Sequence, residues 1–181
     1  TTRTLSVGRS YLEFKFLNVF PFTPSFSADL SNRNFDYTYN VTVGDGVSYN
    51  GLPSAENDIT RSYTFNQVLN YRKSLNGVHN INALLGHENY DYSFSRRVAT
   101  KTGQITSGIT EFDNYVTPFE TEGYKNLNRI ESFFAKVSYN YDEKYFIDGS
   151  VRRDGSSIFS SEKRWGNFFS LGGAWAVSKE D

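Results

Sequence analysis

Two histidines are the side chains of this sequence best suited to acid–base chemistry or metal binding. His79 and His87 have the same parity and lie eight residues apart. On an extended strand this spacing separates them by about 26 Å, which is too far for both to bind one metal ion. We therefore expect both histidines to face solvent or to lie at a rim, and we predict no metal site.

Asp142 and Glu143 are the most obvious pair of carboxylates. Because they are adjacent, a turn would point their side chains apart, so they could not flank one reacting bond. The sequence has no Gly-x-Ser-x-Gly elbow, no phosphate-binding Gly-rich loop and no zinc-hydrolase motif. It also has no Cys, which excludes thiol catalysis and thiolate metal sites. The sequence therefore predicts neither an enzyme nor a bound cofactor.

The densest group of charged and hydroxyl side chains is Arg152-Arg153-Asp154-Gly155-Ser156-Ser157. These groups could bind a carboxylate or sugar hydroxyls. The interpretation that we favour is structural, because the end of a strand explains every residue type in the segment. One arginine would point into the lumen of a barrel and its neighbour towards lipid headgroups. Asp-Gly would then start a loop that the serine hydroxyls cap.

Composition favours strands. Aromatic residues make up 17% of the 181 residues, while all hydrophobic residues together make up only 38%, which is little for a large buried core. No apolar run approaches the roughly 20 residues of a membrane helix. The formal net charge is −1 and both signs are intermixed, so the sequence shows no basic stripe for nucleic acid.

Side-chain character alternates residue by residue from Asn128 to Ser178, which predicts three strands. They are expected at 128–141, 145–153 and 165–178, joined by a turn at 142–144 and a loop at 154–164. Apolar residues of one parity in the first of these are Phe133, Ala135, Val137, Tyr139 and Tyr141. Successive side chains of a strand point to opposite faces, so each strand has one apolar and one polar face. The wall of a bacterial outer-membrane β-barrel requires this pattern.

The rest of the sequence predicts four more strands, for about seven in total. They are expected at 9–17, 22–37, 58–71 and from 79 to about 97, with connections at 18–21, 40–57, 74–77 and 98–128. Pro24 suggests that the second strand begins after it, and Gly86 suggests a bulge that resets the two faces. Short and longer connections alternate, as in outer-membrane barrels, whereas a soluble sandwich has no reason to sort its loops in this way.

Three segments resemble the SusC/RagA family of TonB-dependent outer-membrane transporters: Ser138–Tyr145, Ser150–Ser157 and Arg164-Trp165-Gly166. A looser resemblance covers Asn82–Glu88. The resemblance implies an all-β fold in which residues 1–181 form an antiparallel segment of a transmembrane barrel of about 22 strands. The chain has no Met and no signal-peptide pattern, so we expect a partial barrel domain that lacks the plug, the TonB box and the N-terminal region. The signature residues expected to be structural are Arg152, Arg153, Asp154, Gly155, Ser156, Ser157, Arg164, Trp165 and Gly166.

The resemblance also implies a function: import of nutrients, as glycan or peptide oligomers, across the bacterial outer membrane. The implied partners are the lipid bilayer, a SusD-like surface lipoprotein and the TonB complex, the last through a part of the protein outside this chain. The alternative is a soluble all-β carbohydrate-binding or adhesin module whose aromatic side chains stack on sugars. The loop aromatics that would suit this role are Tyr49, Phe112, Tyr115 and Phe119. What covers the apolar face distinguishes the transporter barrel from the soluble module. A sandwich buries this face against a second sheet, whereas in a barrel it contacts lipid.

Overall fold

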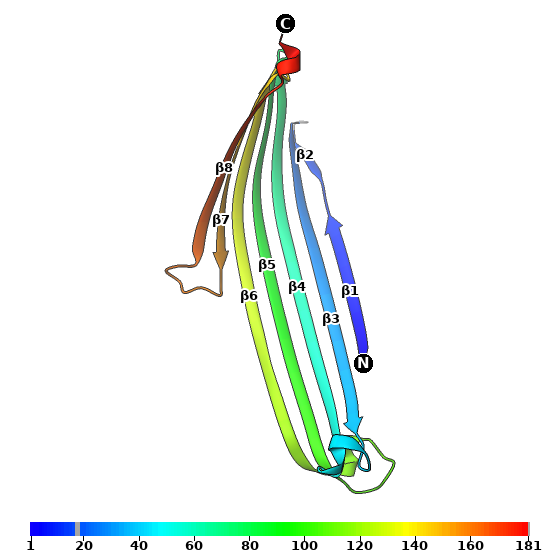
Figure 1. Cartoon of the computed structure of the whole chain (residues 1–181). Helices are drawn as coiled ribbons and strands as arrows, with labels where there is room; N and C mark the ends of the chain where they lie inside the picture. Colours follow the sequence, from blue (N-terminus) through cyan, green and yellow to red (C-terminus); the bar gives the residue numbers. More distant parts are fainter. Residues whose placement is uncertain (17–18, 181) are drawn as a thin grey trace. The chain divides into compact units, whose positions relative to one another are not determined.

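The computed structural model describes residues 1–16 and 19–180, which form mainly long strands (Figure 1). In chain order the elements are β1 (Thr2–Tyr11), β2 (Phe14–Phe16), β3 (Phe20–Tyr39), η1 (Gly44–Val47), β4 (Leu52–Leu75), β5 (His79–Gln104), η2 (Phe112–Asn114), β6 (Tyr115–Tyr141), β7 (Tyr145–Ser156), β8 (Trp165–Trp175) and η3 (Val177–Lys179). The strands form one eight-stranded sheet in the order β1-β3-β4-β5-β6-β7-β8, with β2 paired to β3. From β3 to β8, neighbours in the sheet therefore follow one another along the chain. Among the described residues, no helix is long and apolar enough to cross a membrane.

Two tight turns lie where the sequence predicts them. Asn76 and Gly77 connect β4 to β5 with φ values of 53° and 75°. Asp142 and Glu143 connect β6 to β7, each with a φ of 51°. Two consecutive residues with positive φ match the twist of the flanking strands, and Asn, Asp and Gly tolerate this conformation best. The predicted turns at 74–77 and 142–144 are confirmed.

The predicted strand ends are wrong on the other side of the sheet. β4 begins at Leu52, so the expected loop at 40–57 covers only 40–51. β5 continues to Gln104 and β6 begins at Tyr115, so the expected loop at 98–128 covers only 105–114. β7 extends to Ser156, and the last loop spans 157–164. The alternation of short and longer connections is nevertheless confirmed.

Gly86 does not mark a bulge. Asn80 bonds to Asn140 and His87 stacks on Phe133, so the two contacts are seven residues apart on both β5 and β6. A bulge would make these two spacings unequal. Gly86 instead makes room for an aromatic ring, because a Cβ atom there would lie 2.1 Å from the ring of Phe134.

Pro24 lies inside β3, where the sequence argues against a strand. The carbonyl of Pro24 accepts a bond from the N–H of Leu12 at 3.0 Å, and Leu12 falls between the end of β1 and the start of β2. The N–H that proline lacks would point to the same side as this carbonyl in an antiparallel pair. The interruption between β1 and β2 therefore lies where β3 lacks a backbone N–H that could donate a hydrogen bond.

Both ends of the sequence depart from their predicted strands. The strand expected at 9–17 corresponds to parts of β1 and β2, and its last residue, Leu17, lies outside the described residues. The same holds for Asn18 at the start of the predicted turn at 18–21. The strand expected at 165–178 ends at Trp175 and is followed by η3.

The chain divides into two compact units, which are described separately below. The loop unit consists of residues 1–7, 29–62 and 92–127 and contains the loops 40–51 and 105–114. The turn unit consists of the described residues of 8–28, 63–91 and 128–181 and contains both tight turns. Strands β3 to β6 each contribute residues to both units.

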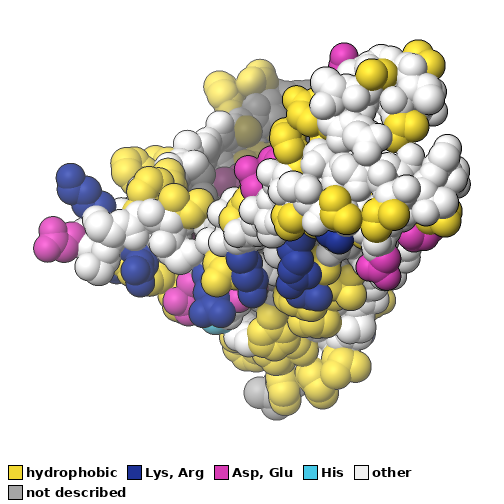
Figure 2. Space-filling view, turned by 90° about the horizontal axis from the view of Figure 1, so that it is seen from below, with side chains coloured by type: hydrophobic (Ala, Val, Ile, Leu, Met, Phe, Trp, Pro, Cys, Tyr) yellow, Lys and Arg dark blue, Asp and Glu magenta, His cyan; other side chains and the backbone are white. Residues whose placement is uncertain are grey.

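Few hydrophobic side chains are buried. Among the described residues, those below the surface are Leu52, Val98 and Tyr115, all in the loop unit. In the turn unit, Phe169 and Leu171 are 86% and 83% exposed. Figure 2 shows hydrophobic side chains at the surface beside lysines and arginines. A sheet with so much uncovered apolar area needs lipid or another molecule to cover it.

Candidate functional site

The register of β6, β7 and β8 fixes which side chains of the turn unit share a face. Ala135 lies opposite Val151 in one pairing, and Val151 lies opposite Phe169 in the next. Directly opposed residues point to the same side of a sheet. We call this side the apolar face. Its members on β6 to β8 include Phe133, Ala135, Val137, Tyr139, Tyr141, Tyr145, Ile147, Val151, Trp165, Phe169, Leu171 and Trp175.

Aromatic side chains form a row at each end of the apolar face. At the turn end, the ring of Tyr145 lies 6.4 Å from that of Tyr141 and 6.4 Å from that of Trp175. At the other end, Phe133 lies 6.2 Å from Trp165. An apolar band between two aromatic rows is typical of outer-membrane barrels, whose amphipathic rings lie at the two interfaces.

The two histidines lie at these two rows, and they are half-buried rather than facing solvent. Nδ1 of His79 lies 2.8 Å from the hydroxyl of Tyr139. The ring of His87 stacks on Phe133 at 4.7 Å, and its Nε2 lies 3.2 Å from a carboxylate oxygen of Glu131. These contacts give each histidine an aromatic and a polar neighbour. Within the described part of the chain, no group of three or more His, Cys, Asp or Glu side chains could hold a metal ion.

The opposite face of the turn unit, which we call the polar face, carries a ladder of polar contacts. Ser138 donates a hydrogen bond to Asp148, and Nζ of Lys136 lies 3.8 Å from the same carboxylate. The hydroxyls of Ser150 and Ser170 lie 2.7 Å apart. These side chains satisfy one another across strands, as a surface facing water requires.

Arg152 is the centre of the polar face near the far end of β7. Its Nε donates to Asp154 at 2.7 Å. Its Nη2 donates to the Ser132 hydroxyl at 3.1 Å and to the Glu88 carboxylate at 3.4 Å. The guanidinium also lies 5.5 Å from the centre of the Phe134 ring. Two carboxylates, a hydroxyl and an aromatic ring therefore hold one arginine in a fixed orientation.

The two arginines of the signature lie on opposite faces. Arg153 lies opposite Asn167 on the apolar-face side, and its guanidinium is 4.9 Å from the centre of the Trp165 ring. Arg152, next to it, points to the polar face. The strand alternation alone produces this separation.

The structure brings the two parts of the signature together across β7 and β8. Asp154 pairs with Gly166 and Gly155 pairs with Trp165, so both residues lie inside a strand. The expectation that Asp-Gly starts the loop is wrong. A Cβ atom on Gly155 would lie 2.9 Å from the Trp165 ring, so glycine lets this ring lie flat on the strand.

The rest of the signature closes the loop after β7. The N–H of Ser156 donates to the carbonyl of Arg164 at 3.1 Å. Ser157 forms two bonds with Arg129, donating its N–H to the Arg129 carbonyl at 2.9 Å and accepting the Arg129 N–H on its hydroxyl at 2.8 Å. The loop 157–164 is thus attached to β6 through Ser157 and to the end of β7 through Arg164.

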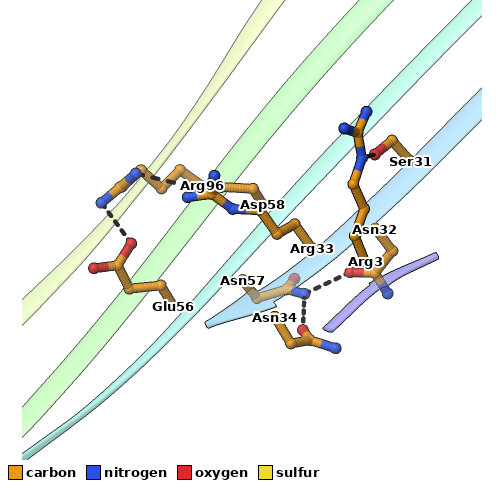
Figure 3. A network of polar contacts seen from close by, with 9 residues as sticks. All are labelled: Arg3, Ser31, Asn32, Arg33, Asn34, Glu56, Asn57, Asp58 and Arg96. Atoms are coloured by element: carbon orange, nitrogen blue, oxygen red, sulfur yellow. Dashed lines mark hydrogen bonds and ion pairs between the residues drawn. The ribbon is translucent and has the colours of Figure 1, made fainter. Parts of the chain in front are cut away.

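One face of the loop unit carries a network of ion pairs (Figure 3). Arg96 reaches Glu56 at 2.8 Å and Asp58 at 3.8 Å, while Arg33 reaches Asp58 at 3.3 Å. The carboxylate side chains are only 15% and 14% exposed, so the arginines shield them from solvent. Nearby, Nε of Arg3 donates to the hydroxyl of Ser31 at 3.2 Å.

The other face of the loop unit carries an amide cluster. Nδ2 of Asn57 donates to Oδ1 of Asn32 at 2.8 Å and to Oδ1 of Asn34 at 2.6 Å (Figure 3). Asn57 stands between Glu56 and Asp58, and alternation places it on the other side of the strand. The loop unit is therefore polar on both faces here.

Sequence reasoning missed this network, because it assigned Glu56 to the loop 40–57 and did not pair Asp58 with Arg33 or Arg96. Of the aromatics proposed to stack on sugars, Tyr49 and Phe112 do lie in the connections 40–51 and 105–114, whereas Tyr115 and Phe119 lie in β6. Tyr115 is only 2% exposed, and the rings of Tyr49 and Phe119 contact each other at 5.1 Å. The available signal was charge: Glu56 and Asp58 share a parity on β4, and each neighbouring strand carries an arginine, Arg33 on β3 and Arg96 on β5.

Comparison with known proteins shows which proteins this chain resembles. The chain matches no family model. It is 30% identical over 146 residues to TonB-dependent receptor P39 of Formosa agariphila, covering 73% of this chain and 13% of that protein. It is 27% identical over 136 residues to TonB-dependent receptor SusC of Bacteroides thetaiotaomicron, covering 75% and 13%. The chain belongs to the SusC/RagA family of TonB-dependent receptors.

Solved structures of this family confirm the fold class. The RagAB peptide transporter superposes with a TM-score of 0.88 at 22% identity, covering 98% of this chain and 21% of that chain. The predicted all-β, antiparallel segment of a larger barrel wall is thus confirmed. The chain spans about a fifth or less of the length of these relatives.

Proposed function

We propose that the chain forms part of the barrel wall of a TonB-dependent transporter that imports nutrients across the bacterial outer membrane. The observation that carries this proposal is the apolar face, which is uncovered and bounded by aromatic rows. β7 and β8 have 12 and 11 residues, close to the roughly 9–11 that cross a bilayer when tilted. Lipid would cover the apolar face, and the polar face would line the lumen.

The proposed cargo is a glycan or peptide oligomer. The solved RagAB structures are named as a peptide transporter and a peptide importer, which supports the peptide class. The polar face offers side chains that can bond either class, such as the cluster around Arg152. The role that we propose is transport rather than catalysis, since the relatives are receptors and transporters.

The proposed partners follow from the same family. A SusD-like surface lipoprotein would cover the lumen, and the TonB complex would supply energy through a TonB box. We place the plug and the TonB box in parts of the receptor outside residues 1–181, which would be a partial barrel domain. The nine signature residues would have a structural role in this wall, joining the ends of β7 and β8.

The test is uptake by living cells. Deleting the gene for the full-length receptor should abolish uptake of labelled peptide or glycan oligomers, and the intact gene should restore it. A gene without the TonB box should fail to restore uptake although its product reaches the outer membrane. Unchanged uptake after deletion, or a receptor that fractionates with soluble proteins, would contradict the proposal.

A further inference from the structure

A cavity with charged walls interrupts the apolar face of the turn unit at the end where Phe133 and Trp165 lie. Its volume is about 480 Å³. Aromatic rings line one part of it, and charged side chains line another. The residues that line the cavity include Tyr63, Asp91, Arg129, Glu131, Arg164 and Trp165. A charged cavity beside an aromatic row lies where a barrel wall meets lipid headgroups.

Two arginines, Arg129 and Arg164, line this cavity, and a third, Arg153, lies against the Trp165 ring that also lines it. Nε of Arg129 is paired with Asp91 at 2.7 Å. Arg153 and Arg164 form no ion pair within the part of the chain that the structure describes, and both are exposed. Arg153 rests on the Trp165 ring, which holds its guanidinium at the edge of the cavity. Guanidinium groups favour phosphate, which they bind through two parallel hydrogen bonds.

A second depression, of about 590 Å³, lies next to the first and is almost entirely apolar. Its walls include Leu85, Ala135, Val151 and Phe169, together with Phe133 and Arg153. Phe133 and Arg153 both contact Trp165, which lines the charged cavity. The charged cavity and the apolar groove therefore meet at the Trp165 ring.

We propose that these two depressions together bind one molecule of a phosphorylated glycolipid of the outer leaflet. Its phosphate would lie against Arg153, Arg164 and Arg129, and its acyl chains would lie in the apolar groove. Asn89, Asp91 and Ser157 add amide, carboxylate and hydroxyl groups to the cavity, which suit sugar hydroxyls better than the small headgroup of a glycerophospholipid. The inference rests on the outer-membrane location proposed above.

The test uses the full-length receptor, purified and stripped of lipid, with lipid A and phosphatidylglycerol as probes in native mass spectrometry. Lipid A should bind at lower concentration than phosphatidylglycerol. Changing Arg129, Arg153 and Arg164 together to Gln should weaken lipid A binding by about tenfold or more, since charge-assisted bonds are lost. Arg153→Gln alone should give a smaller loss, and it serves if the triple variant does not assemble.

Lys136→Gln is the matched control, because Lys136 lies opposite Ser150 on the polar face and lines neither depression. It should leave lipid A binding unchanged. Equal binding of the two lipids, full binding by both arginine variants, or an equal loss in Lys136→Gln would overturn the glycolipid site. Outer-membrane fractionation and heat-modifiable migration are measured separately. A receptor that fails those assays refutes the proposed location, whereas one that passes them without lipid A binding refutes only this site.

Discussion

The turn unit and the loop unit share strands but distribute their side chains differently. Strands β3 to β6 contribute to both, yet the turn unit has one apolar face and the loop unit has polar clusters on both faces. Exposed apolar side chains occur in both units, but the buried Leu52, Val98 and Tyr115 all belong to the loop unit. Each unit therefore matches a different medium.

The comparison separates what the backbone does from what the side chains do. Backbone groups of a sheet bond to neighbouring strands, so the same ladder is stable in lipid or in water. The side chains alone then determine whether a face of the sheet is suited to lipid or to water. Residues 63–75 of β4, 79–91 of β5 and 128–141 of β6 belong to the turn unit, each about the length of a membrane-crossing strand. The full strands of 24, 26 and 27 residues are much longer than a bilayer requires.

The largest expected effect is a charge on the apolar face. Leu171→Arg should destabilise the full-length receptor by about 2–4 kcal/mol, because an arginine facing the middle of the bilayer loses hydration. Thr121→Arg in the loop unit should cost much less, since that unit is polar on both faces. Heat-modifiable migration of the receptor in outer-membrane fractions measures both. Equal losses for the two variants would show that the units do not face different media.

A smaller effect is expected at the Trp165 contact. Gly155→Ala should cost about 2 kcal/mol, because its methyl group would overlap the ring and push it off the strand. Gly172→Ala is the control, since no atom lies within 4 Å of a Cβ atom there. Thermal inactivation of the two variants gives the comparison. A Gly155→Ala receptor as stable as the Gly172→Ala receptor would remove the packing explanation for this signature residue.

In the loop unit, Arg96→Met should cost about 1 kcal/mol, because Glu56 and Asp58 keep their partly buried charges and lose a partner. Hydrogen exchange should rise in β4 and β5 within residues 52–62 and 92–104. Arg97→Met is the matched control: Arg97 is exposed and forms no ion pair among the described residues. Similar exchange in the two variants would mean that the network does not stabilise the loop unit.

The smallest effect concerns pH at the 142–144 turn. A hydrogen bond from Lys144 lowers the pKa of Glu180, and one from Lys179 lowers the pKa of Glu143. A glutamate whose pKa is lowered in this way stabilises the folded turn at pH values above the ordinary glutamate pKa, near 4.3. This stabilisation is lost as the pH falls through the lowered pKa. Residues 176–180 should therefore exchange faster below that value. In a variant with Glu180→Gln and Glu143→Gln, exchange at neutral pH should already be fast, and persistent protection would contradict the assignment.

The same difference between units explains what the sequence could predict. In the turn unit, alternation of Phe133, Val137 and Tyr139 with polar residues gave the strands, the tight turns and the two faces. In the loop unit both faces are polar, so a strand such as residues 115–127 shows no period of two in hydrophobicity. Residues 98–128 therefore looked like a loop.

Contacts between strands lay beyond sequence reasoning for a different reason. The Arg33–Asp58–Arg96 network and the Gly155–Trp165 contact depend on register between segments far apart in the chain. Alternation defines the faces of one strand, but it does not define which residues of two strands are opposite. The separation of Arg152 from Arg153 needed only alternation, and the sequence was enough for it.

The central claim is that the apolar face of the turn unit contacts lipid while its polar face and the loop unit contact water. Spin labels on single cysteines test it most directly, and this chain has no cysteine of its own. Labels at Val137 and Leu171 in the reconstituted full-length receptor should collide more with oxygen than with a water-soluble nickel complex. Labels at Ser170 and Asn34 should show the reverse. Labels at Val137 and Leu171 that favour the nickel complex would contradict the account.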